Sequence, residues 1–205
     1  MKAINQAKSC VPALLLILSI LASCSNILHL NVDYRLPAAT EALKGRKVFL
    51  VFDDIRTNKD VIGPRARAAY HGVSENVSLS WAGGPHSTSR VGVYELPALF
   101  TEVFKRRLKQ AGAEVVTSRG GAEVEMWILL EDFLLDLDRK TWKARMTYEG
   151  RLVKDERILS RQRVGGEAER LRLIGQNEAD RMLGEFFTDA INRLDFVRLF
   201  EQASL

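Results

Sequence analysis

The sequence predicts a single two-layer α/β domain, with a mixed or antiparallel sheet of about four to six strands and two amphipathic helices on one face. Two observations predict this class. Residues 96–112 and 177–194 place apolar side chains at helical spacing, while residues 142–153, within a β-prone stretch over 123–164, alternate between apolar and polar as antiparallel strands do. The chain has 205 residues, 46% hydrophobic and 27% charged, which is enough for one core.

The first 23 residues have the layout of a secretory signal. Lys2 and Lys8 precede an uncharged apolar run over 11–22. A transmembrane anchor is the alternative, but the apolar stretch between Ser9 and Ser23 falls short of the roughly 20 residues that cross a bilayer. A buried core helix is disfavoured by its position at the N-terminus behind two lysines.

The exit of this segment resembles the lipobox of bacterial lipoproteins at each of its positions, Leu21, Ala22, Ser23 and Cys24. The resemblance implies cleavage before Cys24, a diacylglycerol on its sulfur and an acyl chain on its new amine. Two or three acyl chains anchor a protein firmly, and one does not. The alternative is a chance cysteine after an ordinary signal. No cofactor besides this covalent lipid is expected.

Removal of residues 1–23 changes the charge and cysteine count. It takes away Lys2, Lys8 and Cys10, so Lys plus Arg falls from 30 to 28 against 26 acidic residues, and the net charge falls from +4 to +2. A near-balanced surface excludes the clustered positive charge of a nucleic-acid-binding protein. The one remaining cysteine would carry the lipid.

Residues 24–46 are expected to form a lipidated tether, with the folded domain over 47–205. Ser25 follows the acylated position. By the sorting rule of enteric bacteria an aspartate there retains lipoproteins in the inner membrane, so serine favours the periplasm-facing leaflet of the outer membrane. The inner membrane stays the alternative.

The domain opens with a dense β-prone run over 47–52, read as the first core strand. Residues 57–90 are expected to be a long irregular stretch with one strand over 77–81, and loops of that length are usually functional. Residues 96–112 predict a helix with Pro97 in its first turn and Gly112 at its end. A short strand over 114–117 follows.

In the middle of residues 123–138, both odd and even positions are apolar, so both faces of the segment are apolar. This pattern is typical of a central strand. Residues 142–153 alternate cleanly and 157–164 are more polar, so 123–164 predicts an antiparallel meander with a polar edge. A second helix begins near Asn177.

These segments in this order resemble the YajG-type lipoproteins of Gram-negative bacteria. The residues that carry the resemblance are the lipobox, the first strand running into Asp54 and Arg56, the pair Ile62-Gly63, and the helix over 99–112 with the Glu-Val-Val that follows. More distantly the layout resembles auxiliary lipoproteins of ABC-type transporters and the N-terminal domain of TolB. The resemblance brings no catalytic residues. The segment between Gly63 and Leu96 is longer than the family pattern.

Four residues are candidates for contact with a partner: Asp54, Arg56, Gly63 and Trp81. Asp54 has two other readings, either as part of a cation site with Asp53 or as the ion-pair partner of Arg56. Trp81 is equally consistent with a cover on the core. No metal site is expected, because His29, His71 and His86 lack a second His or Cys at ligand spacing.

The basic residues over 105–109 are expected on the solvent face of the first helix, either simply solvated or in contact with anionic lipid headgroups. Three functions follow from these features. The first is a non-enzymatic envelope lipoprotein that binds an unidentified envelope protein, with an exposed patch around 63–93. The second is an auxiliary lipoprotein of an ABC-type lipid transporter, which requires an open apolar cavity. The third is an envelope hydrolase, for which no nucleophile or carboxylate pair is visible.

Overall fold

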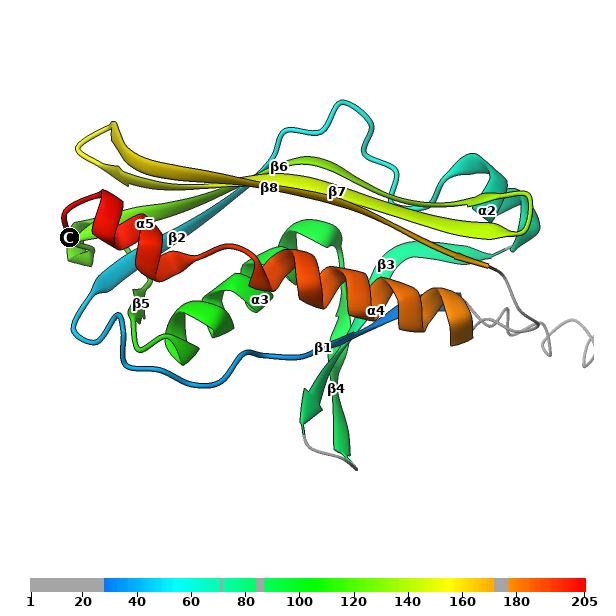
Figure 1. The fold of residues 1–205 in the computed structure, drawn as a ribbon, viewed down its shortest axis with the longest axis horizontal. Helices are drawn as coiled ribbons and strands as arrows, with labels where there is room; N and C mark the ends of the chain where they lie inside the picture. Colours follow the sequence, from blue (N-terminus) through cyan, green and yellow to red (C-terminus); the bar gives the residue numbers. More distant parts are fainter. Residues whose placement is uncertain (1–27, 71, 84–86, 172–176) are drawn as a thin grey trace, which may run out of the picture.

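The computed structural model describes residues 28–70, 72–83, 87–171 and 177–205, which form two sheets and several helices. The predicted α/β class is therefore confirmed, with a second and smaller sheet added (Figure 1). The larger sheet has the strand order β5-β2-β6-β7-β8, with bounds β2 Lys47–Asp54, β5 Glu114–Val116, β6 Val124–Asp138, β7 Thr141–Lys154 and β8 Arg157–Leu171. The smaller has the order β1-β3-β4, with bounds β1 Leu28–Tyr34, β3 Val73–Gly83 and β4 Ser87–Tyr94.

The predicted meander is confirmed in β6, β7 and β8, which pair antiparallel in sequence order. β2 runs parallel to both of its neighbours, β5 and β6. In the strand order of this sheet, β6 is the middle strand. Along β7, Trp142, Ala144 and Met146 are buried while Lys143 and Arg145 are exposed. This alternation gives the sheet one face toward the core and one toward solvent.

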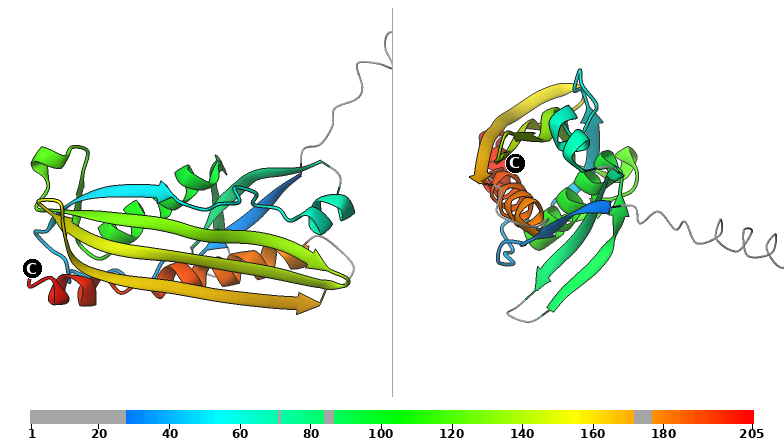
Figure 2. Two further views of the ribbon diagram at one scale, coloured as in Figure 1. Left: turned by 90° about the horizontal axis from the view of Figure 1, so that it is seen from above. Right: turned by 90° about the vertical axis from the view of Figure 1, so that its right-hand side faces the viewer.

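Both predicted helices cover the same face of the larger sheet (Figures 1 and 2). They are α3, Leu96–Gln110, and α4, Asn177–Asn192. Pro97 lies in the first turn of α3, and Gly112 has a φ of +94°, a left-handed conformation that glycine adopts readily just after a helix. Three shorter helices were not expected: α2 Pro64–Ala69, η1 Arg119–Gly121 and α5 Phe196–Gln202.

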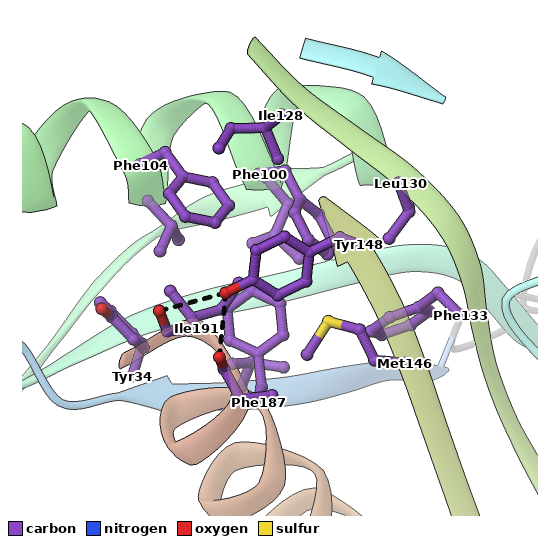
Figure 3. Close-up of a cluster of buried hydrophobic side chains, with 14 of the residues drawn as sticks. Tyr34, Phe100, Phe104, Ile128, Leu130, Phe133, Met146, Tyr148, Phe187 and Ile191 are labelled. Atoms are coloured by element: carbon purple, nitrogen blue, oxygen red, sulfur yellow. Dashed lines mark hydrogen bonds between the residues drawn. The ribbon is translucent and has the colours of Figure 1, made fainter. Parts of the chain in front are cut away.

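Aromatic rings fill the space between the sheet and these helices (Figure 3). Phe100 of α3 is fully buried, and its ring centroid lies 5.3 Å from that of Phe52, 5.5 Å from Phe187 and 6.0 Å from Phe133. These partners come from β2, α4 and β6, and the edge-to-face contacts with Phe187 and Phe133 stabilise a core beyond simple burial. Phe100 thus joins three elements.

Arg107 is buried against the end of α4, which corrects its expected place on the solvent face of α3. Its guanidinium donates to the carbonyls of Ile191 at 2.6 Å and Leu194 at 3.0 Å. Tyr148 donates its hydroxyl to the carbonyl of Ala190 at 3.0 Å. The last carbonyls of a helix lack internal partners, so these side chains complete the end of α4. The helical spacing of Arg107 already placed it next to the apolar stripe.

Part of the expected tether is folded. β1 lies within residues 24–46, and its inward residues Val32 and Tyr34 are fully buried. β1 pairs in parallel with β3, whose Val77 and Leu79 oppose Leu30 and Val32. The folded part of the chain therefore begins well before residue 47. The apolar–polar alternation over 30–34 is short, and β3, the partner strand, is distant in the sequence. The sequence of this segment alone therefore gave little indication of a strand.

One helix covers the outer edge of β1. Residues of α4 spaced by four, Asp180, Gly184, Thr188 and Asn192, face this edge. The Asp180 carboxylate accepts from the Asn31 backbone N–H at 2.9 Å, and the Asn192 amide donates to the Arg35 carbonyl at 3.0 Å. A strand edge with satisfied backbone groups offers no template for further pairing. Among the described strands of the small sheet, β4 keeps a free edge.

The segment over 57–90 is more regular than expected. The predicted strand over 77–81 is confirmed within β3, but α2 and the first half of β4 also fall in this stretch. Val77 and Leu79 are fully buried, so the segment contributes to the core and is not a dispensable loop. Its turn-forming residues, Gly63-Pro64 and Gly72, separate short elements that pack on distant parts of the chain.

Candidate functional site

Three of the four candidate contact residues lie together, and the fourth lies elsewhere. Asp54, Arg56 and Gly63 belong to the end of β2 and the loop that leads to α2. This loop lies against β6, since the Ile55 N–H donates to the Leu130 carbonyl. Trp81 lies on β3 in the other sheet. The four residues predicted from the sequence therefore do not form one site: Trp81 is separate from the other three.

Arg56 is 5% exposed and holds the loop together. Its guanidinium donates to both carboxylate oxygens of Asp54, each at 2.9 Å, in a bidentate pair. The same group donates to the carbonyls of Lys59 at 3.1 Å, Asp60 at 3.1 Å and Phe133 at 3.0 Å. A side chain so enclosed offers a partner almost no surface, so its predicted contact role gives way to a structural one.

The ion-pair reading of Asp54 is confirmed. Burial raises the pKa of the Asp54 carboxyl, but hydrogen bonds from Arg56 and Lys59 outweigh burial and hold that pKa below its usual value. Both oxygens are already occupied by these cations. Within the described part of the chain, no group of three or more His, Cys, Asp or Glu side chains is arranged to hold a metal ion.

Gly63 serves the packing of α2 on β6. Its N–H donates to the Leu135 carbonyl at 2.8 Å, and a Cβ at this position would lie 2.2 Å from the side chain of Asp136. The Asp136 carboxylate accepts from the Ala66 N–H at 2.9 Å, near the start of α2. A carboxylate there completes a free backbone donor of the first turn. Any larger residue at 63 would displace it.

Trp81 covers one end of the core and supports an exposed hairpin. Its ring packs edge-on against Tyr34 at 5.7 Å, and the guanidinium of Arg106 lies 4.4 Å from the ring centroid. These contacts support the interpretation of Trp81 as a cover on the core. Trp81 also faces Ser89 of β4 in the sheet register, so it links α3 to the hairpin.

The β3–β4 hairpin, called the arm below, projects away from the body of the molecule (Figures 1 and 2). Val91 is 36% exposed and Val93 45% exposed on the strand with the free edge. Val91 falls at a shift in register, between the pairs Leu79–Gly92 and Ser80–Arg90. Within the range 63–93, where an exposed patch was expected, these two valines are the exposed large apolar side chains among the described residues. Exposed apolar side chains on a free strand edge are typical of a contact surface.

Beside the arm, α3 presents a basic strip formed by Lys105, Arg106 and Lys109. In the described part of the chain none of the three makes an ion pair, and Arg106 instead packs on Trp81. Other cations of the surface do form ion pairs, as Arg163 does with Glu131. With Glu102 beside these three cations, the strip keeps a net positive charge.

The most apolar cavity is small. It is about 30 Å³ in volume, and its lining includes Leu30, Ile62, Leu135 and Trp142. Sites for small molecules usually measure some 300 Å³ or more. A larger hollow of about 910 Å³ follows β1 and α4, but polar residues such as Asn31, Asp33 and Arg35 line it. Neither cavity suits an acyl chain.

Several predicted features lie outside the described residues. These are the lipobox residues Leu21, Ala22 and Ser23, the lipidation site Cys24, and the loop histidines His71 and His86. Among the helices that the structure does describe, none is both long enough and apolar enough to cross a membrane.

No family model and no curated protein matches this chain. Solved structures similar to it include a Xanthomonas campestris protein of the DUF330 family, at 13% identity and a TM-score of 0.49, covering 84% of this chain and 95% of that one. The lipoprotein GNA1162 of Neisseria meningitidis is 7% identical with a TM-score of 0.38, over 73% and 99%. A Helicobacter pylori homolog of neuraminyllactose-binding hemagglutinin is 9% identical with a TM-score of 0.41, over 82% and 96%. These likenesses do not assign a family.

Proposed function

We propose that this chain is a non-enzymatic, lipid-anchored lipoprotein of the Gram-negative envelope that binds a protein partner through the arm. The observation that carries the proposal is the pair of exposed valines, Val91 and Val93, on the free edge of a projecting strand. The lipobox ending at Cys24 supports the anchor, and the residues quoted above support a YajG-type lipoprotein. Ser25 supports the periplasm-facing leaflet of the outer membrane.

The position of β1 agrees with anchoring at Cys24. Four peptide units separate Cys24 from Leu28, so the chain length allows at most about 14 Å between their Cα atoms. This start is at the same end of the molecule as α2 and the turn between β6 and β7 (Figure 1). The arm projects from the side of the body, which leaves it open to a partner in the periplasm.

The auxiliary role in lipid transport remains the alternative. It requires an apolar cavity that accepts an acyl chain, and the apolar cavity of about 30 Å³ has room for only one or two water-sized groups. An envelope hydrolase requires a nucleophile with a base, or paired carboxylates in a cleft. In the described region, the carboxylate of Asp54 at the end of β2 is already engaged in a structural ion pair with Arg56.

A photocrosslinking amino acid at position 93, in the native membrane, is expected to give an adduct with one envelope protein. The matched control is position 158, because Ile158 is 49% exposed on β8, the edge strand of the other sheet. Mass spectrometry of the adducts provides the measurement. Equal yields of the same adducts from both positions, or no adduct from position 93, would contradict the proposal.

A further inference from the structure

We infer that the partner contributes an extended, acidic segment, which pairs with the free edge of β4 and places carboxylates against the basic strip of Lys105, Arg106 and Lys109. This inference rests on the proposed function and specifies the chemistry of the partner.

The case for a strand comes from the edges of the two sheets. The edge of β1 is covered by α4, and β5 has only three residues. β8 carries exposed charged side chains along its edge, among them Arg161, Arg163 and Glu167. Charged side chains on an edge strand protect that edge from pairing with another strand. β4 instead ends in Val-Gly-Val-Tyr over 91–94, with both valines exposed. An extended peptide that adds to such an edge gains main-chain hydrogen bonds and side-chain contacts together.

The case for acidity comes from the neighbouring helix. α3 follows β4 after a single residue, and its Arg106 packs on Trp81, which opposes Ser89 of β4. A strand added to β4 therefore runs close to the basic strip. The only carboxylate that lines the same hollow is Glu102, which leaves the local charge positive. Acidic side chains on the added strand would be attracted by the positive charge of the strip, and this attraction would favour the pairing register that brings the carboxylates next to it.

This charge also disfavours a second copy of the chain as the occupant. Symmetric pairing of two β4 edges is isologous, so each surface would meet itself. Two basic strips without ion-pair partners would then approach one another, and like charges in such an interface oppose association.

The strip is poorly placed to touch lipid headgroups. Lys105 and Lys109 lie in the C-terminal half of α3, which leads into β5. β5 lies at the opposite end of the long axis from the start of β1, where the anchor joins (Figure 1). A molecule held by its N-terminal end thus presents this strip away from the bilayer, and a protein segment is the occupant that the geometry favours.

The first test is charge reversal in the crosslinking experiment. Lys105→Glu with Lys109→Glu is expected to lower the yield of the position-93 adduct at least tenfold. Lys140→Glu with Lys154→Glu is the matched control, because both lysines are exposed in the larger sheet, one in the β6–β7 turn and one at the end of β7, and its yield should not change. An undiminished adduct in the first variant would overturn the acidic partner and leave the proposed function standing. A missing adduct in the unchanged chain would overturn both.

The second test uses defined probes on the full-length lipid-anchored chain in detergent. Labelled ten-residue peptides of alternating Val-Glu and alternating Val-Lys are compared by fluorescence anisotropy. We expect only the acidic peptide to bind, at least tenfold more weakly to the Lys105→Glu and Lys109→Glu variant, with slower hydrogen exchange in β4 and not in β8. Binding without protection of β4, equal binding of both peptides, or no binding would overturn the inference. Strip-dependent binding to anionic vesicles alone, or self-association abolished by Val93→Lys, would assign the surface to lipid or to a second copy.

Discussion

Phe100→Ala is expected to lower the free energy of unfolding by about 4 kcal/mol, because a fully buried phenylalanine leaves both lost transfer energy and a cavity. Phe100 contacts rings from β2, β6 and α4, and the cavity left by its loss would lie where these elements meet. Its neighbours are themselves large rings held by their own contacts, so they cannot collapse far into the space (Figure 3). Urea unfolding followed by tryptophan fluorescence measures the loss.

The control for this substitution is Ile158→Ala. Ile158 is an aliphatic residue of β8 that is 49% exposed, and truncation of such a residue usually changes stability by roughly 0.5 kcal/mol or less. If the two variants unfolded at the same urea concentration, the aromatic cluster would not be the centre of the core.

Arg56→Ala is expected to cost about 3 kcal/mol, because it leaves a partly buried carboxylate and three carbonyls without their donor. The carbonyls of Lys59, Asp60 and Phe133 all accept from this one guanidinium. The loop between β2 and α2 should also become susceptible to proteolysis. Thermal unfolding and limited proteolysis of the mature chain measure these two effects.

Arg163→Ala is the comparison for a surface ion pair. The Arg163 side chain is 65% exposed and pairs with Glu131 on the outer face of the sheet. Exposed pairs contribute 1 kcal/mol or less, about a third of the expected effect at Arg56. A loss at Arg56 no greater than that at Arg163 would show that the loop does not depend on the buried guanidinium.

The elements with strong local periodicity were predictable from the sequence. α3 and α4 each place apolar residues on one face, and β7 alternates over its first half, so these patterns indicate both the type of element and its buried side. The meander followed from the same alternation, since consecutive strands with short turns pair with their neighbours.

The small sheet was not predictable in the same way. β1 pairs in parallel with β3, and the pairs Leu30–Val77 and Val32–Leu79 join segments that are distant in the sequence. No local pattern identifies such a partner. The edge of β1 is completed by Asp180, Gly184, Thr188 and Asn192, whose spacing of four is visible in the sequence, but whose target is not.

The candidate site was predictable only in part. Asp54 and Arg56 stand two residues apart, so their pairing could be foreseen, while the three carbonyls that bury Arg56 come from the fold. Lys105, Arg106, Arg107 and Lys109 read as one basic run, yet Arg107 points into the core and the others outward. The helical period separates them: position 107 lies with Phe104 and Leu108 on the buried face.

The arm and the basic strip act in the envelope only if the chain is held there by its lipid. Lipidation of Cys24 at the mature N-terminus is therefore the central claim. The direct measurement is the mass of the N-terminal peptide of the protein purified from native membranes. The account predicts a chain that begins at Cys24, with diacylglycerol on the sulfur and an acyl group on the amine. A peptide that begins at Met1, or one with an unmodified thiol at position 24, would contradict it.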